Sequence, residues 1–281
     1  MSTTVTPRPP LQMARLEEPK TLDDSVRGID QVVDWAIKAE SHIGYFAALY
    51  KRITLAIQDA ITEGVFDDGD RVGQLGIVFS QRYFKSLNAY FYPDECQGLT
   101  LPWEVSFVGD QNHKAIMLQH MMAGLNAHIT FDLGLATLAI AGNSLDTLEN
   151  DFNRVNALLC SQIPGILDVV QQLSPDLRLI RRLIPDEVGL LKRVLTKLRR
   201  GAWLFAIYMA KHPQNGREKT VNHEAWTAAV GSWYLQPSAR WTLFPVLVRV
   251  IAKHESRDVA VNIRALEGIT NTPEKLNKAY L

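Results

Sequence analysis

Apolar residues recur three and four positions apart along most of the chain, and the recurrence is clear in residues 25–63. The apolar positions there are Ile29, Val32, Val33, Ala36, Ile37, Ile43, Phe46, Ala47, Leu49, Tyr50, Ile53, Leu55 and Ile57. This spacing is the period of an amphipathic α-helix. The stretch is too long for one typical helix, so we expect a break at Ser41–His42 or Gly44, with Ser41 as a helix cap and Gly64 as the stop of the second helix.

Similar spacing fills almost every other segment, whereas the strict alternation of a β-strand is nearly absent. The pattern therefore predicts an all-α fold, a multi-helix bundle of roughly ten helices around a buried central helix. The longest apolar run, residues 117–142, predicts that central helix. His120, Asn126, His128 and Asp132 interrupt it, and a membrane span rarely carries so many polar groups. We expect a core helix and no membrane span.

Acidic residues precede the predicted helix 71–92. Asp67, Asp68 and Asp70 surround Gly69. Carboxylate oxygens on a tight turn are ligands of Ca²⁺, but the EF-hand pattern with its terminal Glu is not present. Because Asp accepts hydrogen bonds from the free N–H groups of a first helical turn, we interpret the cluster as a helix cap.

Prolines and polar residues indicate the domain limits. Three prolines within residues 7–10 prevent a helix there. We therefore expect residues 1–20 to form a disordered arm and residues 21–281 to form a single all-helical domain. The polar loop 211–219 is the candidate sub-boundary within it.

Composition excludes some partners. Thirty Lys and Arg balance thirty Asp and Glu, and the isoelectric point is near 7.1. Such a chain has no global field that attracts nucleic acid, so we expect no nucleic-acid partner. Because the chain is neutral overall, we interpret a group of five basic residues near position 195 as a solvated helix face; they are Lys192, Arg193, Lys197, Arg199 and Arg200.

The two cysteines, Cys96 and Cys160, lack C-x-x-C spacing. This pattern fits a reducing compartment and excludes a disulfide scaffold or a zinc ribbon. The N-terminus also lacks the apolar core of a signal peptide. We therefore expect a cytoplasmic location.

The central helix carries the densest candidate chemistry. At about 100° per residue, His120, His128 and Asp132 form one polar strip. Gly124 lies within the strip and leaves room for another backbone or a ligand. His128 and Asp132 are four residues apart and can meet directly. Asn126 lies off the strip, where it can join two helices.

Three interpretations of this strip stay open. First, His128 and Asp132 are ligands of a divalent metal (Zn, Mn or Fe), completed by Asp151, His120 or His254. Second, Asp132 orients His128 as a general base without a metal. Third, the pair forms a satisfied buried hydrogen-bond network.

Two further groups are candidates. Arg82, which lies between Phe79 and Tyr83, can bind an anionic ligand or form a salt bridge to Asp67, Asp68 or another acidic neighbour. His254 and Asp258 repeat the four-residue spacing of His128 and Asp132. They form either a second half of a metal site or an exposed ion pair.

At these residues the chain resembles an uncharacterised bacterial all-helical family, a domain of unknown function with a G-x-N-A-H-I-x-x-D-L core. The matching residues are Gly124, Asn126, Ala127, His128, Ile129, Asp132 and Leu133. The resemblance extends over the first two thirds of the chain, through Tyr50–Thr54, Phe66–Asp68, Phe79–Tyr83, Trp103 and Asp151–Asn156. It implies a helical architecture and a grouped site, but no reaction.

The functional expectation is a small-molecule enzyme with His128, Asp132, Asp151 and Arg82 as catalytic candidates. Metal-assisted hydrolysis of an ester, phosphoester or lipid-like substrate is the first hypothesis. The alternatives are a metal-free proton-transfer or cyclisation enzyme of secondary metabolism and a non-catalytic binding or scaffold protein. The expected partner is a small apolar or amphipathic molecule, or a second copy in a homodimer, held by aromatic residues. These are Trp203, Phe205, Trp226, Trp233, Tyr234 and Trp241.

Overall fold

The computed structural model describes residues 9, 11–141, 145–178, 186–237 and 243–281, and this part of the chain contains helices and no strand. The α-helices are α1 (Leu22–Ala39), α2 (Ile43–Thr62), α3 (Gly69–Phe91), α4 (Leu101–Val108), α5 (Met117–Leu125), α6 (Leu133–Ala141), α7 (Glu149–Leu173), α9 (Glu187–Lys211), α10 (Gly216–Leu235), α11 (Leu243–Ile251) and α12 (Val259–Glu267). The predicted all-α fold is confirmed.

The predicted break in the first helical stretch lies between α1 and α2. Glu40 adopts a left-handed conformation with φ of 50°, which ends α1. The Ser41 hydroxyl accepts a hydrogen bond from the Ile43 N–H (3.3 Å) and donates one to Asp110 Oδ1 (3.0 Å). The N-cap residue of α2 is His42 rather than the expected Ser41, which precedes it. The Ser41 hydroxyl still binds the first N–H of the helix and joins it to a distant segment. Gly64, with φ of 68°, follows the end of α2.

The acidic cluster before α3 is a helix cap, as the sequence indicated. Asp68 is the N-cap residue, and its Oδ1 accepts a hydrogen bond from the Arg71 N–H at 3.0 Å. Asp70 lies in the first turn, where its charge favours the helix dipole.

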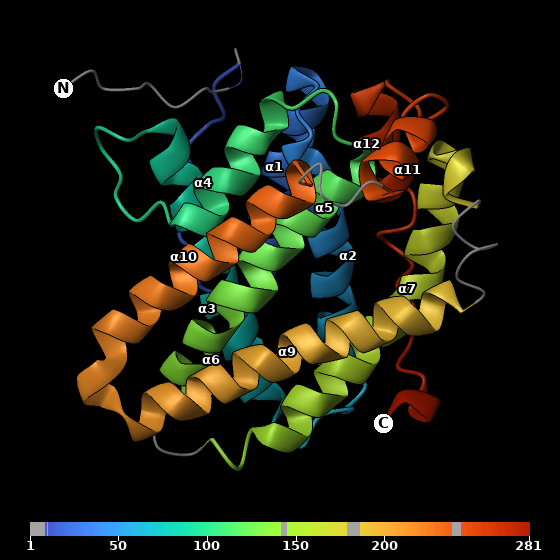
Figure 1. The fold of residues 1–281 in the computed structure, drawn as a ribbon. Coiled ribbons are helices and arrows are strands. Elements are labelled where there is room, and N and C mark those ends of the chain that lie inside the picture. Colours follow the sequence, from blue (N-terminus) through green and yellow to red (C-terminus); the bar gives the residue numbers. More distant parts are fainter. Residues whose placement is uncertain (1–8, 10, 142–144, 179–185, 238–242) are drawn as a thin grey trace.

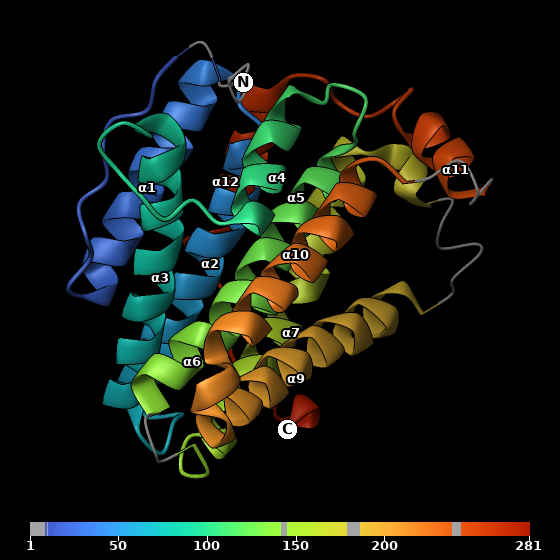
Figure 2. The same cartoon turned by 60° about the vertical axis from the view of Figure 1, so that its left-hand side comes forward.

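α5, the π-helical segment η2 (Asn126–Asp132) and α6 form one run through the molecule. α2 and α3 lie behind this run in Figure 1, and α9 and α10 lie in front of it. Figure 2 shows the same two pairs to the left and to the right of the run. Within the described residues, only Met117–Ala141 is long and apolar enough to cross a membrane, and 67% of its most apolar window is buried inside the protein. The run therefore has the character of the predicted core helix.

The described part of the expected N-terminal arm packs against α3. Met13 and Leu16 are buried. The Asn88 side chain accepts a hydrogen bond from the Leu16 N–H (2.9 Å) and donates one to the Leu16 carbonyl (2.8 Å). Residues 11–20 are thus anchored, whereas we expected disorder over all of residues 1–20. Residues 1–8 and 10 lie outside the described residues.

The candidate sub-boundary at 211–219 is a tight connection. α9 continues to Lys211, the 3₁₀ turn η4 (Pro213–Asn215) follows, and α10 begins at Gly216. Both helices contact the central run. The described parts on either side of the connection therefore share one core.

Gly124 allows α5 and α2 to approach closely. A Cβ at this position would lie 2.6 Å from Phe46 Cγ. The space beside Gly124, which we expected to admit a backbone or a ligand, is thus filled by the Phe46 ring.

We expect Gly124→Ala to lower the free energy of unfolding by about 1–3 kcal/mol, because the added methyl group overpacks the core. The matched control is Gly201→Ala in α9, where an added Cβ meets nothing within 4 Å. That substitution should be neutral or stabilising by up to about 1 kcal/mol. Urea denaturation of both variants measures the difference. Equal effects at the two positions would contradict the close packing of α5 on α2.

Candidate functional site

The segment that carries the sequence motif is a π-helix. In η2, the Leu133 N–H donates a hydrogen bond to the His128 carbonyl, five residues earlier. This wider turn changes the direction of side chains relative to an α-helix, and such turns frequently occur at functional sites. The side chains of His128 and Asp132 approach each other, as their four-residue spacing predicted, but they form no hydrogen bond. Nδ1 and Oδ2 are 3.9 Å apart, which exceeds hydrogen-bond distance.

Asp132 is bound by residues from two other helices. Its Oδ1 accepts a hydrogen bond from Arg82 Nε of α3 at 2.7 Å, and its Oδ2 accepts one from Trp103 Nε1 of α4 at 2.6 Å. The carboxylate is only 1% exposed. The ion pair expected for Arg82 therefore exists, but its partner is Asp132 rather than Asp67 or Asp68.

His128 lies in a box of aromatic rings. Its ring stacks on Phe79, with centroids 3.4 Å apart, and meets the edge of Tyr50 at 4.4 Å. Phe46 and Trp103 close the box. The side chain is buried, and neither ring nitrogen has a hydrogen-bond partner. Burial lowers the pKa of His128 to about 4, and the nearby Asp132 carboxylate offsets only part of this effect. The imidazole is therefore neutral at pH 7.

An apolar space adjoins this box. The inner cavity, about 60 Å³, is lined by aliphatic residues together with Phe46, Tyr50, Thr54, Phe79, His128 and Arg199. A second space of about 130 Å³, the α7–α9 groove, is lined only by aliphatic and methionine side chains of α2, α5, η2, α7 and α9. Five residues line both spaces, which are therefore adjacent; they are Leu49, Ile53, Leu125, Ile129 and Leu159.

Arg199 differs from the solvated basic residue that the sequence predicted. It is only 3% exposed. It lies four residues after Leu195 and four before Trp203, and therefore on the same side of α9 as these apolar residues. This spacing was a signal that the sequence analysis missed. Tyr50 and Phe79 were missed as site residues because their spacing also suits an ordinary core.

The remaining candidate metal ligands belong to other networks. Asp151 is buried and accepts hydrogen bonds from the backbone N–H groups of Asp67 and Asp68, both at 2.8 Å. It thereby holds the loop before α3 against α7. His120 stacks on His42, with ring centroids 4.2 Å apart. No group of three or more His, Cys, Asp or Glu that could hold a metal occurs within the described ranges. The proposed set of His120, His128, Asp132 and Asp151 is therefore not assembled.

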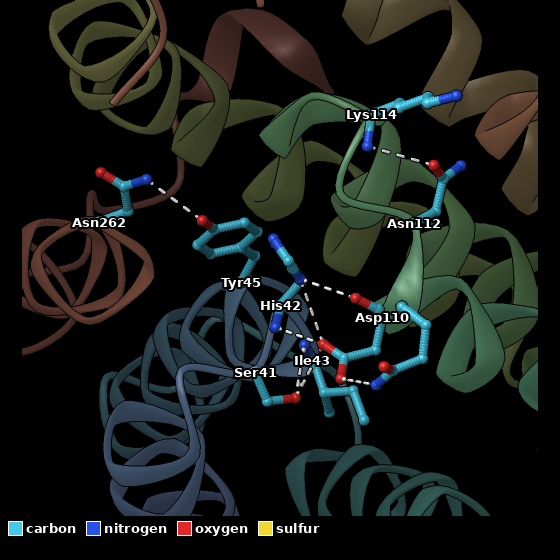
Figure 3. Close-up of polar contacts among 9 residues, drawn as sticks. Ser41, His42, Ile43, Tyr45, Asp110, Asn112, Lys114 and Asn262 are labelled. Atoms are coloured by element: carbon cyan, nitrogen blue, oxygen red, sulfur yellow. Dashed lines mark hydrogen bonds and ion pairs between the residues drawn. The ribbon is translucent and has the colours of Figure 1, made fainter. Parts of the chain in front are cut away.

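The residues around His42 form a second polar cluster, shown in Figure 3. Asp110 Oδ1 accepts hydrogen bonds from the His42 backbone N–H (2.6 Å) and the Ser41 hydroxyl (3.0 Å), while His42 Nδ1 lies 3.0 Å from the Asp110 carbonyl. Asp110 thus ties the start of α2 to the turn after α4. The sequence analysis missed this cluster, because a contact between residues so far apart leaves no local pattern.

The contacts predicted for Asn126 and for His254 with Asp258 have different outcomes. Asn126 joins two helices, as expected, by donating to the Thr227 carbonyl at 2.7 Å. His254 and Asp258 do not form the expected pair. His254 Nδ1 lies 2.7 Å from Asp176 Oδ2, and Asp258 is the N-cap of α12.

Of the aromatic residues expected to line a ligand cavity, those within the described ranges line neither the inner cavity nor the groove. Trp203 and Phe205 are buried elsewhere in the core, and Trp226 is 65% exposed. Trp241 lies outside the described residues.

The described chain is thus an all-α protein with a buried polar site beside an apolar cavity. A protein-family model, described as a family of unknown function (DUF5995), matches residues 22–237 of the sequence. The chain belongs to this family. The expected resemblance to an uncharacterised helical family is confirmed, and the match extends beyond the first two thirds of the chain. No curated protein and no solved structure matches the sequence.

The unpaired state of His128 has a consequence for stability. Its pKa in the folded protein, about 4, lies below the ordinary 6.5. Between these values the unfolded chain binds a proton that the folded protein does not, so stability falls as the pH falls. We expect His128→Phe to stay within about 1 kcal/mol of the wild type at pH 7. As the pH falls from 6.5 to 4, the free energy of unfolding of this variant should decrease by up to about 1.4 kcal/mol per pH unit less than that of the wild type. Urea denaturation across this range measures both effects.

The control for this prediction is Asp151→Asn, which removes an acceptor that two backbone N–H groups require. It should lower the free energy of unfolding by about 1–3 kcal/mol at pH 7. A loss of this size in His128→Phe would mean that the imidazole has a structural hydrogen-bonding role.

Proposed function

We propose that the protein binds a small apolar or amphipathic molecule in the inner cavity and that His128 is the group that hydrogen-bonds to it. One observation carries this proposal: both ring nitrogens of His128 are buried on the cavity wall without a partner. Buried polar groups in folded proteins are nearly always hydrogen-bonded, because leaving one unpaired costs about 1–3 kcal/mol. A ligand that supplies a hydroxyl, carbonyl or carboxyl group would remove this cost.

The state of the imidazole suits such a ligand. A neutral imidazole has one nitrogen that donates and one that accepts. His128 can therefore bind a polar group of either kind, and it can accept a proton from a bound molecule. Each oxygen of Asp132 already accepts a hydrogen bond, from Arg82 or from Trp103, and Oδ2 lies 3.9 Å from His128 Nδ1. This distance is too long for Asp132 to take the donor of His128.

Binding and metal-free chemistry have more support than metal-assisted hydrolysis. His120 and Asp151 lie in separate hydrogen-bond and stacking networks. A metal at His128 would thus lack two of its proposed ligands. The proposal therefore uses only the imidazole and the apolar walls.

The size of the two spaces limits the ligand. Pockets for compact drug-sized molecules are typically about 300–1,000 Å³, whereas the inner cavity is about 60 Å³ and the groove about 130 Å³. A narrow molecule that extends through both spaces suits these volumes better than a broad one.

Binding of 1-decanol, measured by isothermal titration calorimetry, tests the proposal. We expect the wild type to bind it and Leu195→Trp, which fills the groove, to bind at least tenfold more weakly. His128→Phe should bind about five- to tenfold more weakly, the value of one hydrogen bond. The matched control is Leu204→Trp, because Leu204 is also on α9 but is 50% exposed and lines neither space. Absence of binding to the wild type, or equal binding by both tryptophan variants, would contradict the proposal.

A further inference from the structure

Arg199 places a buried cation on the wall of the inner cavity. Its Nη2 donates a hydrogen bond to the Phe152 carbonyl at 3.2 Å, and its guanidinium carbon lies 4.3 Å from the centre of the Phe152 ring. Its Nε has no hydrogen-bond partner. Within the described part of the chain, no carboxylate forms an ion pair with it. The positive charge is therefore only partly compensated.

An uncompensated buried charge is costly. Transfer of an ion from water into a protein interior costs several kcal/mol unless a counter-charge and hydrogen bonds replace the lost water. Burial lowers the pKa of Arg199 to about 9, so the guanidinium is still charged at neutral pH. An anion that entered the cavity would supply the missing counter-charge.

Arg82 and Arg52, two other arginines of the core, either pair with a carboxylate or lie away from the inner cavity. Arg82 pairs with Asp132. Arg52 donates to the carbonyls of Ile269 and Thr272 and does not line the inner cavity. Arg200, the next residue on α9, pairs with Glu149 at the surface, 3.1 Å apart. Arg199 therefore combines burial, incomplete pairing and a position on the cavity wall.

The groove provides a place for an apolar chain. It adjoins the inner cavity at the five shared residues and contains no charged or hydrogen-bonding side chain. Several of its residues, including Leu118, Met122 and Leu191, are partly exposed. The two adjacent spaces thus offer one charged, hydrogen-bonding end and one aliphatic path towards solvent.

We infer that the ligand of the inner cavity is an amphipathic carboxylate, an aliphatic chain that ends in a carboxyl group. The carboxylate pairs with Arg199 and accepts a hydrogen bond from His128, and the chain lies in the α7–α9 groove. A planar carboxylate matches the guanidinium fork, which can bind both oxygens. This inference rests on the proposed binding function and specifies the chemical class of its ligand.

Decanoate and 1-decanol have the same chain length and differ in their head groups, so a comparison of their affinities tests the inference. We expect the wild type, titrated calorimetrically at pH 7.5, to bind decanoate at least tenfold more tightly than 1-decanol. Arg199→Met should lose this preference and still bind 1-decanol. Arg200→Met, which removes an exposed cation from the same helix, should keep the preference.

Two measurements separate loss of charge from loss of structure. Arg199→Met should melt at or above the temperature of the wild type, because an apolar side chain of similar length replaces a poorly paired buried cation. Arg199→Lys, which keeps the charge, should retain part of the preference for decanoate and serves as the test if Arg199→Met does not fold.

The outcomes distinguish the two proposals. If the wild type binds 1-decanol as tightly as decanoate, the inference about the carboxylate is wrong while the cavity remains a binding site. If it binds neither molecule, both proposals are wrong. If Arg200→Met loses the preference as fully as Arg199→Met, surface charge rather than Arg199 selects the anion, and the inference is overturned.

Discussion

A buried carboxylate requires a donor for each of its oxygens, and Asp132 obtains both donors from outside its own helix. Arg82 on α3 binds one oxygen and Trp103 on α4 binds the other. Removal of either donor would leave a buried charge incompletely paired, which typically costs several kcal/mol. The carboxylate therefore fixes the position of the central run relative to two of the helices around it.

The same contact determines the chemistry of His128. Because Arg82 and Trp103 occupy the Asp132 oxygens, and because the π-helical turn separates His128 Nδ1 from the carboxylate by 3.9 Å, the imidazole lacks the partner that its spacing suggested. It is instead held by ring contacts with Phe79 and Tyr50. Stacking fixes the ring without using its nitrogens, and these stay free for a ligand. Asp132 thus positions the helices, whereas His128 is the residue that we propose binds the ligand.

Much of the fold could be predicted from the sequence because helical periodicity and capping are local properties. The cap at Asp68, the stop at Gly64 and the buried central run all follow from nearby residues. Part of the site was predictable for the same reason: an Asp and a His in an apolar helix require special surroundings. The positions of His120, Gly124 and Asp151 could not be predicted, since their environments depend on His42, Phe46 and the loop at Asp67.

Two features could be established only from the three-dimensional arrangement: the π-helical turn at η2 and the burial of Arg199. The 100° step of an α-helix placed His128 against Asp132, and nothing in the spacing indicates the extra residue of a π-turn. The charge of Arg199 suggested exposure, whereas its spacing from Leu195 and Trp203 indicates the buried side of α9. Arg199 is buried, as its position on the helix indicates, although arginine is usually exposed.

The protonation of His128 tests the central claim most directly. Imidazole ¹⁵N chemical shifts, followed by NMR as a function of pH and assigned with His128→Phe, report both the charge and the hydrogen bonding of the ring. We expect a neutral ring without a strong hydrogen bond to Asp132, with a pKa well below 6.5 and near the value of about 4 that burial imposes. A pKa at or above 6.5, or an Nδ1–H hydrogen-bonded to the Asp132 carboxylate, would contradict the account.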